Sequence, residues 1–105
     1  MAKARRPPPP VPEPTPPLVP SPTAQFRKDV KAQAKRGKDI AKLRTVIEIL
    51  AARQPLERRY RNHPLGGPWS GWWDCHVEPD WVLIYKTTPT ELILGRTGTH
   101  SDLFD

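Results

Sequence analysis

The sequence predicts a small α+β domain in which an αα-hairpin packs on one face of a small, mostly antiparallel β-sheet. Two segments with helical spacing of apolar residues lie between residues 23 and 55, and a four-residue loop joins them. Three strand-like segments follow between residues 69 and 97, separated by tight turns. Strands joined by tight turns pair in antiparallel fashion, and a helix pair on one face leaves the other free for a substrate.

Residues 1–22 precede this domain and differ from it in composition. Ten of these 22 residues are proline. Proline fixes φ and lacks an N–H donor, so this segment is expected to be a disordered extension with polyproline II character. Leu18 and Val19 allow a short edge strand at most, because Pro20 and Pro22 exclude a central one. The folded domain is therefore expected over residues 23–105.

Each helix has a start signal and a stop signal in the sequence. Thr23 is a suitable N-cap for the first helix, and Gly37 ends it. Asp39 is a suitable N-cap for the second helix, and Pro55 ends it. Apolar residues recur on one face of each helix. They are Phe26, Val30 and Ala34 in the first helix and Ile40, Leu43, Val46, Ile47, Ile49 and Leu50 in the second.

Three strands are expected after the helices. The first runs from about Trp69 to Val77, the second from Trp81 to Thr87 and the third from Glu91 to Thr97. The second is a continuous apolar run, which is typical of a central strand buried on both faces. Residues 56–68 are expected to form a loop, since prolines and glycines interrupt them. The tail from Gly98 to Asp105 returns His100 and Phe104 to the sheet.

Charge is distributed unevenly along the chain. Residues 25–61 carry twelve Lys and Arg against four Asp and Glu, whereas residues 62–105 carry two against six. A basic half of this kind favours binding to nucleic acid. The loop between the helices, with Lys35, Arg36 and Lys38, is a candidate for phosphate contacts, although a solvated turn has the same composition.

Localisation is predicted to be cytoplasmic. One cysteine permits no internal disulfide, and a reducing compartment is the simpler assumption. The longest apolar run has five residues, which is far too short to span a bilayer. No membrane partner is expected.

Four polar residues are predicted to converge at one end of the meander: His76, Asp80, His100 and Arg96. RNA cleavage without a metal needs a base for the 2′-OH, an acid for the leaving 5′-oxygen and a cation for the phosphate. Imidazoles titrate near pH 6.5 and serve as acid or base at neutral pH. Arg96 is able to bind phosphate bidentately. His100 is predicted to be the general acid, and the base is predicted to be Asp80 or His76, with Asp80 preferred. A carboxylate that is too weak a base would instead orient His76.

Three of the four tryptophans are assigned one of two predicted roles. Trp81, together with Phe104, presents an aromatic face on which an unpaired base can stack. Trp69 and Trp72 are expected to pack in the core or on the sheet. Structural packing is the simpler explanation for any single tryptophan.

Two metal sites compete with this interpretation. A zinc site would use Cys75 and His76 with His63 or His100, but adjacent strand residues point to opposite faces and no zinc-ligand spacing occurs. A magnesium site would use Asp74, Glu78 and Asp80, but Pro79 breaks the strand register between them. We therefore predict no metal and no cofactor.

Three blocks of sequence resemble the YafQ-type toxins of the RelE/ParE superfamily, which belong to bacterial type II toxin–antitoxin systems. The first is His-Pro-Leu at residues 63–65, followed by Gly71. The second runs from Asp74 to Tyr85 and contains His-Val-Glu-Pro-Asp-Trp. The third, from Arg96 to Phe104, contains Arg-Thr-Gly-Thr-His. The similarity extends from about Phe26 to residue 105.

The resemblance implies a RelE-like fold and an mRNA interferase that cuts the message in the ribosomal A site. It implies a 2′,3′-cyclic phosphate and a 5′-hydroxyl as products, without a metal. It also implies a cognate antitoxin as partner, through which alone the toxin contacts operator DNA. The functional residues of the family correspond to His63, His76, Asp80, Trp81, His100 and Phe104, and Arg96 matches a position of phosphate-stabilising charge.

Two departures from the family pattern are evident. A proline-rich extension replaces the first β-strand of the family, which predicts a lost or shortened sheet edge. Trp73 stands where relatives often have a polar or basic residue.

Alternative functions are a non-catalytic, gyrase-directed toxin of the ParE branch, an inactive RNA-binding relative, or an adaptor whose proline-rich segment binds aromatic grooves.

Overall fold

A computed structural model of the chain describes residues 15–105, and the disorder predicted for residues 1–14 lies outside this range. The described part begins with a short extended segment that leads into strand β1 (Val19–Pro22). This strand pairs in parallel with the last strand, β5 (Glu91–Gly98). The first strand is therefore present at the sheet edge, and regular structure begins before residue 23.

The prolines of β1 are compatible with a strand because of their alternation. Val19 donates its backbone N–H to the carbonyl of Thr90, in the turn before β5, at 2.9 Å, and Thr23 donates to the carbonyl of Leu94 in β5 at 3.0 Å. Pro20 and Pro22 occupy the intervening positions, whose nitrogens face away from β5. The edge strand that the sequence allowed is thus formed and includes both prolines.

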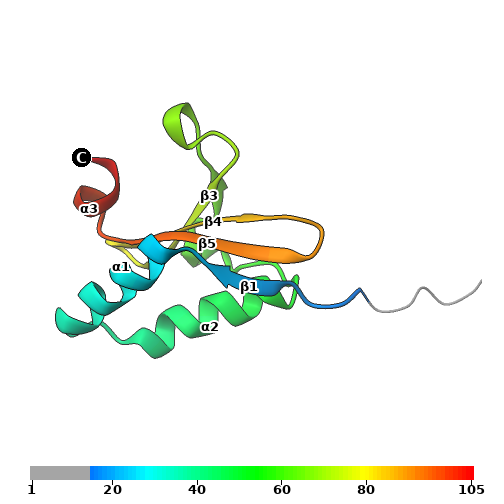
Figure 1. The fold of residues 1–105 in the computed structure, drawn as a ribbon, viewed down its shortest axis with the longest axis horizontal. Coiled ribbons are helices and arrows are strands. Elements are labelled where there is room, and N and C mark those ends of the chain that lie inside the picture. The colour runs from blue at the N-terminus through cyan, green and yellow to red at the C-terminus, as the bar shows by residue number, and fades with distance from the viewer. Residues whose placement is uncertain (1–14) are drawn as a thin grey trace, which may run out of the picture.

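Helices α1 (Ala24–Lys35) and α2 (Ile40–Ala51) form the predicted hairpin and lie together on one side of the sheet (Figure 1). The predicted caps are confirmed: the Thr23 hydroxyl and the Asp39 carboxylate each accept a backbone N–H from the first turn of the helix that follows. Three apolar residues of α2 are buried as its spacing predicts. They are Leu43, Val46 and Leu50.

The buried face of α1 is more polar than its apolar spacing predicts. Phe26 is buried as expected, but Asp29 and Gln33 are buried beside it, whereas Ala34 is exposed. Helix α1 is consequently attached to the sheet by polar contacts as well as by apolar packing.

The sheet has five strands in the order β1-β5-β4-β3-β2. All neighbours other than β1 and β5 pair in antiparallel fashion, so the predicted meander and the α+β class are confirmed. The remaining strands are β2 (His63–Pro64), β3 (Trp73–Glu78) and β4 (Trp81–Thr87).

Both faces of β4 are covered, and this corrects the expectation of a free second face. The face toward the helices holds the larger apolar core, and the other face packs Val82 and Ile84 against Leu103 of α3 (His100–Phe104). In Figure 1, α3 and the loop before β3 lie on the side of the sheet opposite to α1 and α2. A strand that is apolar on both sides requires this second cover.

The segment 56–68 contains more regular structure than a loop, which contradicts its sequence-based assignment. Two single turns of 3₁₀ helix, η1 (Arg58–Tyr60) and η2 (Gly67–Trp69), flank strand β2. Proline is tolerated at the start of η2 and on the edge strand β2 because neither position needs its N–H. The first long strand consequently begins at Trp73 rather than at Trp69.

Trp72 packs against a glycine on β5. A Cβ atom added to Gly95 would lie 2.5 Å from the Trp72 ring, so only glycine allows this approach. Trp69 meets Trp72 edge to face, with ring centroids 5.8 Å apart. Both tryptophans therefore have the packing role that the sequence predicted.

Within residues 15–105, no helix has the length and apolarity needed to cross a bilayer.

Candidate active site

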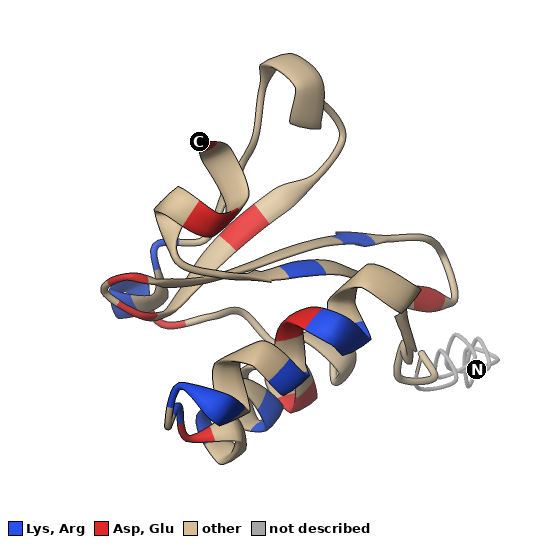
Figure 2. Ribbon diagram, turned by 60° about the vertical axis from the view of Figure 1, so that its left-hand side comes forward, with Lys and Arg blue, Asp and Glu red and all other residues tan. Residues whose placement is uncertain are grey.

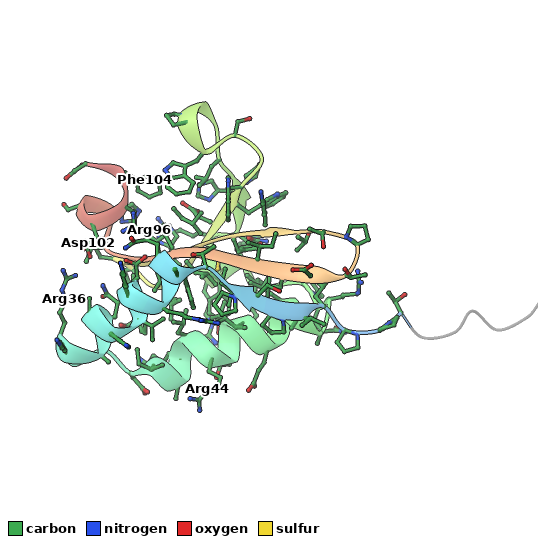
Figure 3. The ribbon with its side chains drawn as sticks, in the orientation of Figure 1. Arg36, Arg44, Arg96, Asp102 and Phe104 are labelled. Carbon is green, nitrogen blue, oxygen red and sulfur yellow. The ribbon has the colours of Figure 1, made fainter. Side chains whose placement is uncertain are left out.

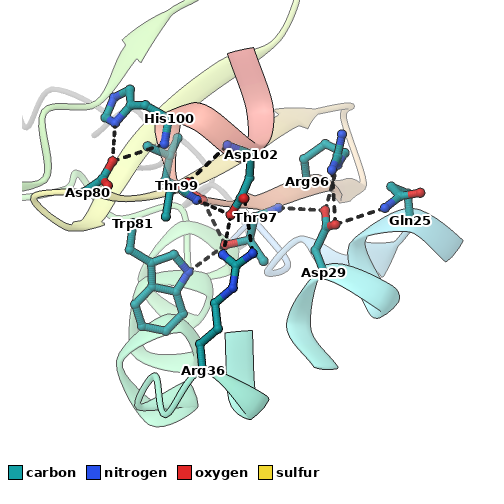
Figure 4. A network of polar contacts seen from close by, with 11 residues as sticks. Gln25, Asp29, Arg36, Asp80, Trp81, Arg96, Thr97, Thr99, His100 and Asp102 are labelled. Atoms are coloured by element: carbon teal, nitrogen blue, oxygen red, sulfur yellow. Dashed lines mark hydrogen bonds and ion pairs between the residues drawn. The ribbon is translucent and has the colours of Figure 1, made fainter. Parts of the chain in front are cut away.

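Asp80 and His100 are in direct contact at one end of the sheet. The Nδ1 atom of His100 lies 2.8 Å from Oδ1 of Asp80, and the backbone N–H of His100 donates to the same oxygen at 3.1 Å (Figure 4). These hydrogen bonds from His100 lower the pKa of Asp80, which keeps its carboxylate ionised at neutral pH. An ionised carboxylate only accepts hydrogen bonds, so Nδ1 of His100 carries a proton and Nε2 is left for a substrate.

His76 is held in an equivalent way at the end of β3. Its Nδ1 atom lies 3.1 Å from the carbonyl oxygen of Pro79. A carbonyl oxygen only accepts, so Nδ1 is the protonated nitrogen and Nε2 of the neutral ring has a free lone pair. The turn between β3 and β4 thus orients His76 through its backbone. Asp80 in the same turn orients His100, not His76 as one sequence-based alternative proposed.

The two imidazoles lie next to each other and next to an exposed aromatic ring. The ring centroids of His76 and His100 are 5.1 Å apart, with an interplanar angle of 54°. Phe104 lies one turn further along α3, with its centroid 6.0 Å from that of His100 (Figure 3). The side chain of Phe104 is 41% exposed, as a stacking platform for a base requires.

Helix α3 is fixed by its own cap and by an ion pair to α1. Thr99 and Asp102 form a capping box, in which each side chain accepts the other's backbone N–H. Arg36, just after α1, donates to Asp102 through Nη1 at 2.6 Å and through Nη2 at 3.2 Å. The Arg36 hydrogen bond lowers the pKa of Asp102. These contacts set the position of His100 relative to Asp80.

His63 lies on β2, opposite Asp74 of β3, and is half exposed. Its Nδ1 lies 2.8 Å from the carbonyl oxygen of Arg61, which takes the hydrogen bond, and 3.0 Å from Oδ1 of Asp74. That carboxylate oxygen is buried and has no hydrogen-bond partner within residues 15–105. Burial raises the pKa of Asp74, and the opposing influence of His63, His76 and His100 is smaller.

Sequence reasoning considered Asp74 only as a metal ligand and missed its position among the three histidines. One sequence signal could have revealed the position of Asp74. Asp74 and His76 are separated by one residue on a strand, so their side chains point to the same face. Asp74 therefore lies beside the candidate catalytic residues as a buried anion.

Trp81 does not face the substrate side, which contradicts its predicted stacking role. Its side chain has no exposed surface, and it belongs to the core beneath the helices. The indole Nε1 donates to the hydroxyl of Thr97 at 2.9 Å, and that hydroxyl donates to the carbonyl of Val82. Trp81 therefore holds β4 against β5 and supports the turn that carries Asp80.

Arg96 is engaged elsewhere, which contradicts its predicted contact with the phosphate. Its Nε and Nη2 atoms donate to the two carboxylate oxygens of Asp29 at 2.7 and 3.2 Å. In Figure 4, Arg96 points toward Asp29 on α1 and away from His100. This pair joins α1 to β5, and Asp29 also accepts the backbone N–H of Thr97.

The cations of the α1–α2 loop are partly neutralised. Lys and Arg are concentrated on the helices and this loop, as the blue segments of Figure 2 show. Arg36 pairs with Asp102, and Lys38 lies 3.5 Å from Glu78, with its ammonium 5.9 Å from the Trp81 ring centroid. Lys35 is exposed. A phosphate contact by Lys35, Arg36 or Lys38 remains a prediction.

Cys75 is unsuited to bind zinc. Its side chain is fully buried on the helix side of the sheet, opposite to His76. Burial raises the pKa of its thiol to about 12, so the thiol stays protonated, whereas zinc binds the thiolate.

Comparison with known proteins agrees with the fold. Residues 18–105 match the model of a family described as the bacterial toxin of type II toxin–antitoxin system, YafQ. The mRNA interferase toxin YafQ of Escherichia coli K12 is 49% identical over 83 residues, which are 78% of this chain and 90% of that protein.

Two solved structures are similar to the whole described domain. The crystal structure of YafQ from E. coli BL21(DE3) has a TM-score of 0.80 and 45% sequence identity, over 84% of this chain and 99% of that one. YafQ in the E. coli DinJ–YafQ toxin–antitoxin complex has a TM-score of 0.78 and 46% identity, over 84% and 98%. The chain therefore belongs to the YafQ family of bacterial toxins of type II toxin–antitoxin systems.

Proposed function

We propose that the chain is an mRNA interferase that cuts messenger RNA in the ribosomal A site by acid–base catalysis without a metal ion. The E. coli K12 relative bears the name mRNA interferase toxin. The observation that carries the proposal is the pair His76 and His100, whose ring centroids are 5.1 Å apart and whose Nδ1 atoms are both engaged. Each ring therefore has its Nε2 atom available for a substrate.

The two rings are assigned different roles because their partners differ. Pro79 offers His76 a neutral carbonyl, which leaves a lone pair at Nε2 for the 2′-OH proton. Asp80 offers His100 an ionised carboxylate, which accepts a charge-assisted hydrogen bond from a protonated ring, so we assign His100 as the residue that donates its Nε2 proton to the 5′-oxygen. Asp80 is then the orienting residue and His76 the base.

The reaction is an intramolecular transesterification. His76 takes the 2′-OH proton, the 2′-oxygen bonds to phosphorus, and the bond from phosphorus to the 5′-oxygen breaks. His100 gives its Nε2 proton to that oxygen. The products are a 2′,3′-cyclic phosphate and a 5′-hydroxyl, with His76 protonated and His100 neutral at the end. Arg96 is paired with Asp29 and does not supply positive charge to the reacting phosphate. The imidazolium of His100 supplies that charge instead.

Phe104 and His63 are assigned to the substrate around this pair. The exposed ring of Phe104 lies beside His100 and stacks on the unpaired base at the cleavage position. His63, half exposed on β2, lies on the Asp74 side of His76 and contacts the neighbouring nucleotide.

The proposed partners are the ribosome, its message and a cognate antitoxin. The structure of the DinJ–YafQ complex provides a related toxin bound to its antitoxin. Operator DNA would be contacted through the antitoxin alone, and the site of action would be the cytoplasm, where message is translated.

Controlled expression in bacteria tests the assignment of the acid. Wild-type protein should stop growth, and His100→Ala should not. Ser101→Ala, an exposed substitution on the same helix, serves as the matched control and should remain toxic. Equal toxicity of His100→Ala and wild type, at equal protein levels, would refute the role of His100.

Cleavage in vitro separates this function from its alternative. Purified protein should cut message on programmed ribosomes and leave free RNA largely intact. A gyrase-directed toxin would instead inhibit supercoiling and leave message whole. A requirement for Mg²⁺ in the chemical step, after the ribosomal complex has been fixed by other means, would refute the metal-independent mechanism.

A further inference from the structure

An open cavity of about 730 Å³ has His76 in its lining. It lies between α2, the turn η1 and the end of β3, and none of the roles assigned above uses it. Its lining includes Lys42 of α2, Arg59 and Arg61 around η1, and His76 and Glu78 of β3. We call this cavity the η1 cleft. One of the two proposed catalytic rings therefore forms part of its wall.

Positive charge dominates the lining of the η1 cleft. Three cations, Lys42, Arg59 and Arg61, face one anion, Glu78. Glu78 is shared between Lys42 at 3.2 Å and Lys38 at 3.5 Å, and the Lys42 hydrogen bond lowers its pKa. The positive charges therefore outweigh the charge of the single carboxylate, and the cleft as a whole attracts an anion.

The two arginines of the cleft are available for a ligand. Within residues 15–105, the Arg61 guanidinium forms no hydrogen bond and no ion pair, and it is exposed. Arg59 pairs only with Glu57, and both side chains of that pair are about 70% exposed, so the pair contributes little. By contrast, the arginines near α3 are occupied by carboxylates: Arg36 by Asp102 and Arg96 by Asp29.

The local structure holds the Arg59 guanidinium and the Arg61 backbone in defined positions. The Arg59 guanidinium lies 4.7 Å from the centroid of the buried Tyr60 ring, and its Nη2 donates to the Tyr60 hydroxyl at 2.9 Å. Arg61 has a left-handed backbone, with φ 45°, and its carbonyl accepts the hydrogen bond of His63. Non-glycine residues at positive φ are uncommon and concentrate at functional sites.

We propose that the η1 cleft binds the ribose–phosphate backbone of the message next to the scissile bond, with Arg59, Arg61 and Lys42 on its phosphates. The strand then passes His76 to reach His100 and Phe104. This inference rests on the proposed function and specifies the path of its substrate. Because phosphate contacts position RNA without reading its sequence, the cleft contributes equally for every codon.

The test uses Arg59→Ala, Arg61→Ala and the double variant, with Arg44→Ala as the matched control. Arg44 is an exposed arginine on the outer side of α2 (Figure 3), so its removal changes the net charge equally. On programmed ribosomes, each cleft variant should raise KM at least about fivefold, with kcat changed much less. Arg61→Lys should recover part of the loss, since it restores the charge.

Binding separates the message from other anionic partners. The message in this experiment has a 2′-deoxy ribose at the cleavage position, so that the complex does not react. The cleft variants should weaken binding to ribosomes that hold this message in the A site and reduce the salt slope by about one per lost phosphate contact. The loss should be similar for different codons and absent for Arg44→Ala.

Three outcomes would overturn the inference. Unchanged KM and salt slope in the double variant would exclude the cleft as a phosphate site. Equal weakening of binding to ribosomes without message would assign it to ribosomal RNA, and a loss confined to antitoxin affinity would assign it to the antitoxin. If wild-type protein cuts no message at all, the proposed function fails, and the binding measurement still reports on the cleft.

Discussion

His76 and His100 lie with their ring centroids 5.1 Å apart, and each directs its Nδ1 proton to a different acceptor, the carbonyl of Pro79 and the carboxylate of Asp80. A site with one base and one acid reacts fastest when the first is neutral and the second is protonated. The rate of message cleavage should therefore pass through a maximum with pH and fall on both sides.

The two limbs of this profile should belong to different rings. His76→Gln should abolish the acid limb and His100→Gln the alkaline limb, and each should reduce kcat by about 10²–10⁴-fold. Single-turnover cleavage on programmed ribosomes, measured from pH 5 to pH 9, provides the profile. A profile that keeps both limbs in either variant would contradict the assignment.

Asp80→Asn distinguishes an orienting carboxylate from a catalytic base. The His100 hydrogen bonds lower the pKa of Asp80, so its carboxylate is ionised throughout the neutral range and is a weak base. We expect kcat to fall about 10–100-fold, which is less than for His76→Gln, with KM little changed. If Asp80→Asn instead lowers kcat at least as much as expected for His76→Gln, and His76→Gln itself retains most activity, Asp80 is the base.

Asp74→Asn should increase stability at neutral pH. Burial raises the pKa of Asp74, and a carboxyl whose folded pKa exceeds its unfolded value destabilises the fold once it is ionised. The variant should therefore raise the free energy of unfolding by about 1 kcal/mol at pH 7.5. The gain should shrink as the pH falls through the folded pKa and disappear below the unfolded pKa of about 4, where the wild-type carboxyl is protonated in both states.

Urea unfolding of Asp74→Asn at pH 7.5 and pH 4.5 measures this difference. Glu91→Gln, at an exposed position, is the control for the loss of one negative charge. A stability gain that is equal at both pH values would exclude the ionised carboxylate as its cause.

Asp102→Asn should detach α3 without unfolding the domain. The Arg36 hydrogen bond lowers the pKa of Asp102, so this residue stabilises the fold above its unfolded pKa of about 4 and loses that contribution as the pH falls. Loss of the capping box and the ion pair should cost about 1 kcal/mol, concentrated in a five-residue helix.

Hydrogen exchange provides the measurement for Asp102→Asn. The amides of α3 should exchange faster and cleavage should slow, whereas the amides of β4 keep their protection. Asp105→Asn, with the same change of charge, should leave both unchanged. Equal loss of protection in β4 and α3 would mean that Asp102 supports the whole fold.

Gly95→Ala should disturb the tryptophan that packs on β5. The added Cβ would lie 2.5 Å from the Trp72 ring, so the ring must move, at a cost of about 1–3 kcal/mol. Gly66→Ala is the matched control, because no atom lies within 4 Å of its Cβ position and its φ is negative. Thermal unfolding of both variants, with Trp fluorescence, checks this expectation. Equal melting temperatures would show that Trp72 adapts freely.

Much of the fold was predictable because its signals are local. The caps Thr23 and Asp39 lie within a few residues of the N–H groups that they accept, and the apolar run of β4 is continuous. The turn at Pro79 and Asp80 was predictable for the same reason. The antiparallel meander then predicted that this turn and His100 converge at one end of the sheet.

The orientation of individual side chains was harder to predict. A register shift in the pairing of β3 with β4 occurs between His76 and Glu78, so counting residues through the turn does not reveal which face receives Trp81. The Arg96–Asp29 pair joins residues that are 67 positions apart in the sequence. No local sequence pattern predicts that this arginine pairs with that carboxylate. Both errors concern contacts that only the assembled fold creates.

The prolines of β1 have a consequence for the behaviour of the protein at high concentration. An outer strand normally presents free N–H groups to which a strand of another molecule can bond, and this is how sheets aggregate. Here one outer strand ends in Pro22 and the opposite one, β2, ends in Pro64. Proline thus removes a backbone N–H donor from each edge strand. A strand of a second molecule can therefore form fewer hydrogen bonds at either edge, and the sheet resists growth into larger assemblies.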